Sequence, residues 1–483
     1  MQKLVRVDLA SNGLSDVRLT NVPALGYLDL SDNQIADAGV LTRLGSLPAL
    51  WELILSGNPI GAMTAPAAPA DFPKLRTLAL CRSQIGSIGT LTALMHPPTL
   101  ETLDLSNNHI RNCDGLAKLP PLYSLTLSDN QIGDLSGFPA WPAMGELYLS
   151  NNQLTNVGPL SSLRALKTID LSGNRISDLS PLANLTRLAY LHCSNNQVTT
   201  TSALKNLTGI GELFLDGNQI CDTSGLAAMT FLKTLNLANN QVGDISPLAG
   251  LGYLETLWLS NNLVTDISPL SKLSKLRYAD LTSNRIAGAC KLSGMTNLQS
   301  FFLSYNAITD IEIVGSLNLH MLYLNDNLIA DVNGLTALTN LWQLSLQNNL
   351  ITDISPLIKL KQLSDVALSG NPLNDEAYST YLPQLIASNP GMFLSFPNCT
   401  SPGFVLTVSA TEGGSVAFPG EGPFAYANGG IIGISASAAG PEYKFVGWSG
   451  SAVDAGKVQN PQTLSTTMTV DADYTLQANF QPQ

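Results

Sequence analysis

The 483-residue chain has few charged residues, few aromatic residues and little cysteine. Only 12% of its residues are charged, and 24 Lys and Arg are outnumbered by 36 Asp and Glu, which gives a net charge of -12. Binding to nucleic acid requires clustered basic residues that neutralise phosphates, so we expect no nucleic-acid partner. The sequence also lacks an apolar run close to the roughly 18 residues of a membrane-spanning helix, so we expect no membrane span.

Residues that usually carry catalysis or hold metals are scarce and scattered. The six cysteines form no CxxC pair, and the four histidines lie far apart, so the sequence predicts neither a disulfide framework nor a metal site. The motifs GxSxG and HExxH and the P-loop are absent, and no cysteine has a plausible histidine partner. We therefore expect a protein that is not an enzyme and needs no cofactor, with cysteines that act as small hydrophobic residues.

The most prominent feature of the sequence is one short motif that recurs along most of the chain. The pattern LxxLxLxxN recurs with a step of 22 residues, nine times in succession from Asn108 to Asn306, and the segments 171–188 and 259–276 follow the same pattern. A fixed period of this length predicts a solenoid of about 17 coils. The predicted ladder of structural asparagines comprises Asn108, Asn130, Asn152, Asn174, Asn196, Asn218, Asn240, Asn262, Asn284, Asn306, Asn327 and Asn349.

A single coil cannot fold by itself. Seven buried apolar side chains contribute about 10 to 20 kcal/mol, whereas ordering the backbone of the coil costs at least as much. Stability therefore arises only when coils stack, because each copy is the core of its neighbours.

The positions within a coil predict its local structure. The LxL segment alternates inward and outward, so successive copies predict a parallel sheet. The buried asparagine can satisfy backbone groups of its own and adjacent coils, which an ionised aspartate could not do. The segment that follows, such as Asp178 to Leu182, carries Asp and Ser-Pro and predicts short helical or 3₁₀ turns.

This pattern resembles the leucine-rich repeat, and the 22-residue form with DISPLxxLxxL is similar to that of bacterial internalins. The resemblance spans about residues 4 to 395. It implies an α/β repeat solenoid, a horseshoe with a parallel sheet on its concave side and short helical or 3₁₀ turns on its convex side. Internalins carry a helical cap ahead of the first coil, whereas this repeat starts at Leu4 and no secretory signal precedes it, so we expect a truncated or fragmentary gene product.

The composition changes after the segment FPNCTSPG. The stretches FVLTVSAT, GIIGISASA and MTVDADYTLQANF alternate like strands. With Gly413, Gly414 and FVGWSG they resemble the divergent internalin B-repeat, which implies a small β-rich, β-grasp-like spacer or attachment domain on an exported protein. We predict a repeat array at 1–397 with a closing helix near 375–390, a linker at 398–403, and the B-repeat-like domain at 404–483.

Aromatic and acidic residues gather where the predicted strands point away from the core. Exposed rings cost solvation unless something covers them, and rings among acids are typical of protein contact sites. The alternative is that neighbouring rings only stack across the strands. The predicted partner-binding residues are Tyr148, Tyr190, His192, Phe214, Trp258, Tyr278, Phe302, Tyr323, Glu146, Asp170, Glu212 and Asp280.

These observations favour a non-enzymatic binding module of a bacterial surface or secreted protein, similar to an adhesin. Its concave face would bind a protein with basic groups. A glycan or cell-wall partner is one alternative, since rings with carboxylates also suit sugars, and an intracellular scaffold or effector is another. We expect an extracellular or surface-attached monomer.

Overall fold

The structure is a computed structural model. It describes residues 3–19, 21–37, 39–45, 47–61, 72–89, 91, 97–287, 292, 294–311, 314, 317–396, 404–426 and 430–482. The chain divides into two compact units, Met1–Asn236 (unit 1) and Leu237–Gln483 (unit 2).

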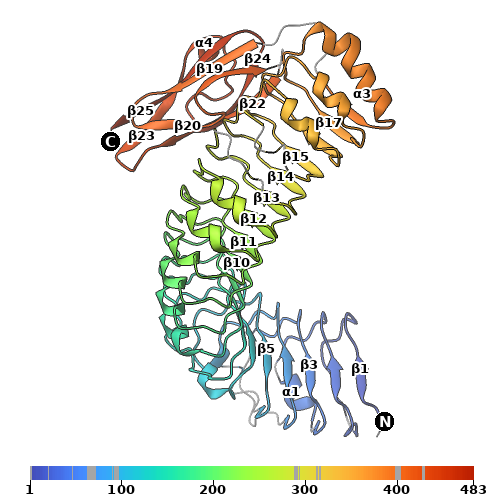
Figure 1. The fold of residues 1–483 in the computed structure, drawn as a ribbon. Helices are drawn as coiled ribbons and strands as arrows, with labels where there is room; N and C mark the ends of the chain where they lie inside the picture. Colours follow the sequence, from blue (N-terminus) through green and yellow to red (C-terminus); the bar gives the residue numbers. More distant parts are fainter. Residues whose placement is uncertain are drawn as a thin grey trace. The chain divides into compact units, whose positions relative to one another are not determined.

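The repeat forms the predicted parallel sheet. Each coil contributes one strand of three residues, and 18 such strands belong to the sheet. Successive strands lie side by side in Figure 1 and pair in parallel and in register, as β1 does with β2 and β12 with β13. The strands of unit 1 are β1 (Arg6–Asp8), β2 (Tyr27–Asp29), β3 (Glu52–Ile54), β4 (Thr77–Ala79), β5 (Thr102–Asp104), β6 (Ser124–Thr126), β7 (Glu146–Tyr148), β8 (Thr168–Asp170), β9 (Tyr190–His192), β10 (Glu212–Phe214) and β11 (Thr234–Asn236). Those of unit 2 are β12 (Thr256–Trp258), β13 (Tyr278–Asp280), β14 (Ser300–Phe302), β15 (Met321–Tyr323), β16 (Gln343–Ser345), β17 (Asp365–Ala367) and β18 (Phe393–Ser395).

The alternation within each strand separates the core from an open face. In β8 the middle residue Ile169 is fully buried, whereas Thr168 and Asp170 on either side are only partly buried. The first and third residues of each strand together form what we call the open face of the sheet. From β2 to β17 the middle residue is buried, as is the apolar residue two positions after it, which confirms the predicted solenoid.

Short helical turns follow the strands. At the start of η3, Asp178 Oδ1 accepts a hydrogen bond from Ser180 N (2.8 Å), and Asp178 Oδ2 accepts one from Ser180 Oγ (2.7 Å). Aspartates 244, 266 and 353 accept a hydrogen bond from the backbone N of the second residue after them in the same way, so this column orders the entry to each turn. The turns are α1 (Val40–Arg43), η1 (Leu116–Lys118), η2 (Gly158–Ser162), η3 (Ser180–Leu182), η4 (Ser202–Leu204), η5 (Ser224–Leu226), η6 (Ser246–Gly250), η7 (Ser268–Lys272), η9 (Asn333–Ala337) and η10 (Ser355–Lys359).

The asparagine ladder is buried and fully bonded. Every predicted member from Asn108 to Asn349 is less than 10% exposed. Asn262 is typical, since its Oδ1 accepts from Val242 N (2.8 Å) and its Nδ2 donates to the carbonyl oxygens of Leu237 (2.8 Å) and Leu259 (3.1 Å). Across the described part of the chain, no buried side-chain nitrogen or oxygen lacks a hydrogen-bond partner. The ladder therefore joins consecutive coils through their backbones, as predicted.

The end of the repeat adds a strand that the sequence did not predict. The closing segment is the π-helical turn η11 (Ala377–Tyr381) followed by α3 (Leu382–Ser388), which buries Leu382 and Leu385. After it, β18 pairs in parallel with β17, so the sheet has one strand more than the 17 predicted coils. The predicted linker 398–403 lies outside the described residues.

The C-terminal residues form a small β-rich domain. Its elements are β19 (Phe404–Ala410), β20 (Gly414–Phe418), β21 (Gly422–Tyr426), β22 (Gly430–Ala438), β23 (Tyr443–Ser449), α4 (Ser451–Asp454), β24 (Ser465–Val470) and β25 (Tyr474–Pro482). Four strands form a mixed sheet in the order β21-β19-β25-β23, and three form an antiparallel sheet in the order β20-β22-β24. Trp448 is 3% exposed in the core and donates from Nε1 to Thr463 O (2.9 Å), so it is a structural residue of the domain.

Candidate functional site

In unit 1, the predicted binding residues lie on four adjacent strands, β7 to β10, at their first and third positions. Tyr190 is 44% exposed, and the rings of His192 and Phe214 meet edge to face with centroids 4.7 Å apart. Tyr148 lies beside Asp170 in register. Its burial and the negative charges of Glu146 and Asp170 raise the pKa of the Tyr148 hydroxyl, which therefore stays protonated and can donate a hydrogen bond.

In unit 2, the predicted rings form one continuous row on the open face. The centroid distances are 5.5 Å from Trp258 to Tyr278, 5.2 Å from Tyr278 to Phe302 and 4.8 Å from Phe302 to Tyr323. The row crosses β12, β13, β14 and β15, and each of its rings is partly exposed. This geometry is thus compatible with both alternatives. The rings stack on their neighbours, and they also remain accessible to a partner.

Carboxylates accompany both groups of rings. Asp280 lies in register between Trp258 and Phe302. Burial, together with the charge of Asp280, raises the pKa of Tyr278. None of the ion pairs among the described residues involves Glu146, Asp170, Glu212 or Asp280. The open face therefore presents rings and carboxylates whose charge no described cation pairs with.

The described residues offer little to a metal ion. They contain no group of three or more His, Cys, Asp or Glu side chains that could hold one. Of the four described cysteines, Cys113 and Cys193 are buried, and burial raises the pKa of each thiol to about 12. Among the helices described, none has the length and hydropathy needed to cross a membrane.

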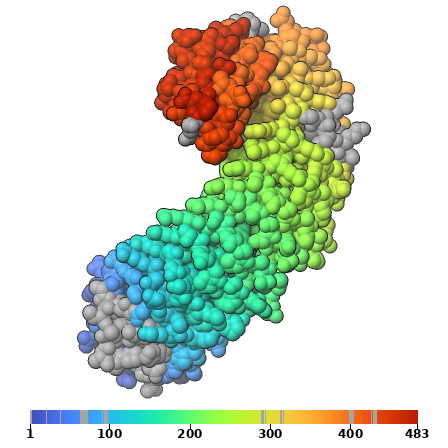
Figure 2. All heavy atoms as spheres, turned by 90° about the vertical axis from the view of Figure 1, so that its left-hand side faces the viewer, coloured from blue at the N-terminus to red at the C-terminus, as the bar shows by residue number. Residues whose placement is uncertain are grey.

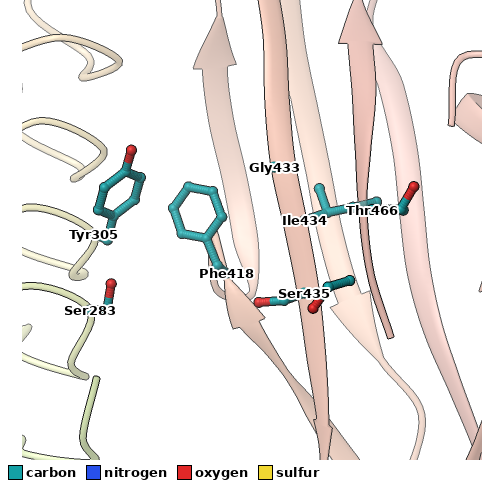
Figure 3. A pocket seen from close by; sticks show the side chains of 8 residues that line it. Ser283, Tyr305, Phe418, Gly433, Ile434, Ser435 and Thr466 are labelled. Carbon is teal, nitrogen blue, oxygen red and sulfur yellow. The ribbon is translucent and has the colours of Figure 1, made fainter. Parts of the chain in front are cut away.

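Unit 2 also contains a second group of contacting side chains, which the sequence did not predict. Tyr305 lies two residues after the buried Leu303, which follows β14. Its ring contacts that of Phe418 in the C-terminal domain edge to face, with the ring centroids 4.5 Å apart. Leu328 packs against that domain's core. Beside the two rings lies a cavity of about 410 Å³, lined by apolar groups and hydroxyls such as Ile434, Ser435 and Thr466 (Figure 3).

The sequence feature that could have indicated these contacts is Tyr305. The corresponding residue of the other coils, just before the ladder position, is mostly Asn, Asp, Ser or Gly.

Family models match both the repeat array and the C-terminal residues. The model described as Leucine Rich repeats (2 copies) matches residues 98–140, 146–184, 230–272, 296–337 and 317–359, and one described as Leucine Rich repeat matches 25–42. The model of the Divergent InlB B-repeat domain matches residues 404–483. No curated protein matches the chain by sequence.

Solved structures show the same relationship for the array. An internalin (inlF) from Listeria monocytogenes is 30% identical with a TM-score of 0.52, and the match covers 58% of this chain and 83% of that one. A leucine-rich repeat protein from Leptospira interrogans is 23% identical with a TM-score of 0.66, covering 81% of this chain and 96% of that one. The second likeness shows the fold alone.

Proposed function

Because the chain belongs to the internalin-like leucine-rich repeat proteins and ends in a divergent B-repeat domain, we propose that it is a non-enzymatic binding module of a bacterial surface or secreted protein. Its open sheet face binds a protein partner. The predicted residues of β7 to β10 and β12 to β15 form the contact surface.

The observation that carries this proposal is the row of rings in unit 2. Four aromatic side chains on four consecutive strands make up a contiguous apolar patch on a face where most other coils carry small or polar residues. Aromatic anchors supply most of the binding free energy at protein interfaces because they bury large areas with little loss of entropy. The family of binding proteins to which the chain belongs supports the same reading.

The ring geometry favours a protein over a glycan. A sugar stacks on a free aromatic face, but Phe302 and Tyr323 are nearly parallel, with an interplanar angle of 20° at 4.8 Å, and so cover part of each other's faces. Their edges remain, and ring edges suit apolar and aromatic side chains, which pack edge to face. The carboxylates of Asp280 and its counterparts in unit 1 favour basic groups on that protein.

The test replaces Trp258, Phe302 and Tyr323 by Ala, singly and together, in the full chain. Partners are captured from cell-surface protein fractions with the unaltered protein, and each variant's affinity for the captured protein is then measured by surface plasmon resonance. Each single substitution should weaken binding about tenfold or more, as expected when an interface anchor is truncated.

Phe231→Ala is the matched control, because Phe231 is 62% exposed in the loop before β11 and lies outside the open face. It should leave binding unchanged. If the triple variant keeps its circular dichroism spectrum and binds as well as the unaltered protein, the open face of unit 2 is not the contact surface.

A further inference from the structure

One column of the repeat adopts the left-handed backbone conformation in nearly every coil. It is the residue just before the ladder position, and in unit 2 it has positive φ at Asn239, Asn261, Ser283, Tyr305, Asp326, Asn348 and Gly370. Asn, Asp and Gly tolerate this conformation, whereas a bulky side chain there is an outlier. In unit 2, Tyr305 at φ 58° is the bulky side chain of this column, and Arg82 at φ 54° is its counterpart in unit 1. Strain of this kind persists where other contacts offset it.

The contact that Tyr305 makes is with the B-repeat domain. Its ring meets Phe418 at the end of β20 with an interplanar angle of 75°, the favourable edge-to-face arrangement. Phe418 stands outside the domain's own core, so its ring is available for this contact. Figure 2 shows the atoms of the domain, in red, directly against the yellow and orange atoms of the coils of the same unit.

The next coil supplies a further contact, because its Leu328 packs against the domain's core. Tyr426, which belongs to that core, is only 3% exposed. The carboxyl of Asp326 accepts hydrogen bonds from Asn348 Nδ2 (2.8 Å) and Asn325 Nδ2 (3.2 Å) and is partly buried. In unit 1, Asp129 occupies the same column and accepts the same bond from Asn151 (2.9 Å), yet it is exposed. The bond from the following coil is thus the same at the two sites. The preceding coil differs, because it supplies Asn107 to Asp129 and Tyr305 to Asp326.

We propose that Tyr305, Asp326 and Leu328 form a built docking surface for the chain's own B-repeat domain, which is held against the array as a reversible latch. The domain is therefore more than the spacer that its family resemblance implies. Since Tyr305 follows Phe302 by three residues, the latched domain borders the strands that carry the row of rings. The latch does not depend on the proposed binding function.

The experiment compares hydrogen–deuterium exchange of the full chain with that of two variants, Phe418→Ala and Tyr305→Asn. Phe418→Ala removes the ring on the domain's side of the contact, and Tyr305→Asn removes the ring on the array's side. Exchange at 303–306, 324–328 and 416–426 should become about two- to tenfold faster, the range that corresponds to one edge-to-face ring pair. Protection of β13 to β15 and of β19 and β25 should stay the same.

Tyr305→Asn separates docking from structural support, because Asn is favoured at positive φ. A residue that only supported the coil would make the array less stable when replaced, whereas we expect the array's urea midpoint to stay or rise while docking is lost. Val446→Ala, a change at an exposed position of β23, is the control and should leave all three segments unchanged.

Unchanged exchange at 303–306 and 324–328 in both variants would overturn the latch. If Phe418→Ala also speeds exchange in β19 and β25, the domain itself has become less stable in that variant. The result for Tyr305→Asn then decides whether the latch exists, because this variant leaves the domain's sequence unchanged. Small-angle scattering gives a second measure, and the radius of gyration should increase in both variants and stay constant in the control.

Discussion

At the scale of single residues, each ladder asparagine joins two coils through several hydrogen bonds. Asn262 makes one accepted and three donated hydrogen bonds to backbone groups of two coils, all of them between 2.8 and 3.2 Å. The carbonyl oxygens of Leu237, Leu259 and Ser260 each accept a second hydrogen bond from another residue, whereas the buried Val242 N–H donates to Asn262 Oδ1 and loses that partner once the carboxamide is gone.

Asn262→Ala should therefore lower the free energy of unfolding by about 1 to 3 kcal/mol, the cost of leaving the buried Val242 N–H unpaired. Asn262→Asp should cost more at neutral pH, since a carboxylate would face carbonyl oxygens without a proton to donate. Urea denaturation followed by circular dichroism measures both. Ser260→Ala, two residues earlier at a partly buried position, is the control and should change stability by less than about 0.5 kcal/mol. Equal effects of Asn262→Ala and Ser260→Ala would contradict the role of the ladder.

Thiol reactivity follows from burial in the same way. Burial raises the pKa of Cys193 to about 12, whereas Cys221 is exposed. At pH 8 an alkylating reagent should modify Cys221 within minutes and leave Cys193 unmodified until the protein is unfolded in urea, because only the thiolate reacts. Peptide mass spectrometry distinguishes the two sites. Rapid modification of Cys193 in the native protein would mean that its coil opens far more readily than its packing implies.

At the scale of elements, the latch gives the B-repeat domain a dependence on pH. Burial raises the pKa of the Asp326 carboxyl, while hydrogen bonds from Asn348, Asn325 and Tyr305 offset part of that rise. The other titratable groups that act across this contact are Tyr305 and Tyr426, and burial raises the pKa of both, so they stay neutral. Undocking exposes Asp326 to water and returns its pKa towards the usual value of 3.8.

The docked state therefore holds the Asp326 proton more tightly than the undocked state. Docking is strongest below the usual pKa of the carboxyl and weakens as the pH rises through the raised, docked value. We expect the radius of gyration of the full chain to increase between pH 4 and pH 8. Asp326→Asn, a change that suits the positive φ, should keep the domain docked at both pH values. Asp129→Asn in unit 1 should leave the pH dependence intact, and if it abolished that dependence Asp326 would not be its source.

The elements also show what the sequence could predict. Strands, turns and ladder followed from local periodicity, because the same seven apolar positions recur in each coil and their register admits one stacking. The eighteenth strand was missed since Phe393 to Ser395 pairs with β17 without a ladder asparagine or a following turn of its own. The latch was missed because it joins residues more than 100 positions apart, and only the unusual tyrosine at 305 marked one side of it.

The open face was predictable for a different reason. Once the strand register is fixed, the side on which Trp258 or Phe302 points is fixed as well. How the rings meet was not predictable, since the 20° angle between Phe302 and Tyr323 depends on rotamers that neighbouring coils select together. That angle is the feature that favours a protein partner over a sugar.

At the scale of the whole molecule, charge should govern how fast a partner arrives. The chain carries a net charge of -12, and the carboxylates of the open face have no ion-pair partner among the described residues. A long-range negative field attracts a basic protein, and salt screens that field over a distance of about 10 Å at 0.1 M.

The association rate with a basic protein partner should therefore fall about tenfold between 50 and 500 mM NaCl, while the dissociation rate, set by the buried rings, changes much less. Biolayer interferometry at several salt concentrations separates the two rates. Asp280→Asn should reduce the salt dependence of association, because it removes a carboxylate between Trp258 and Phe302. Trp258→Ala should instead speed dissociation and leave the salt slope unchanged. A partner whose association is insensitive to salt would be held by the rings alone, and the acidic residues of the open face would then serve solubility rather than recognition.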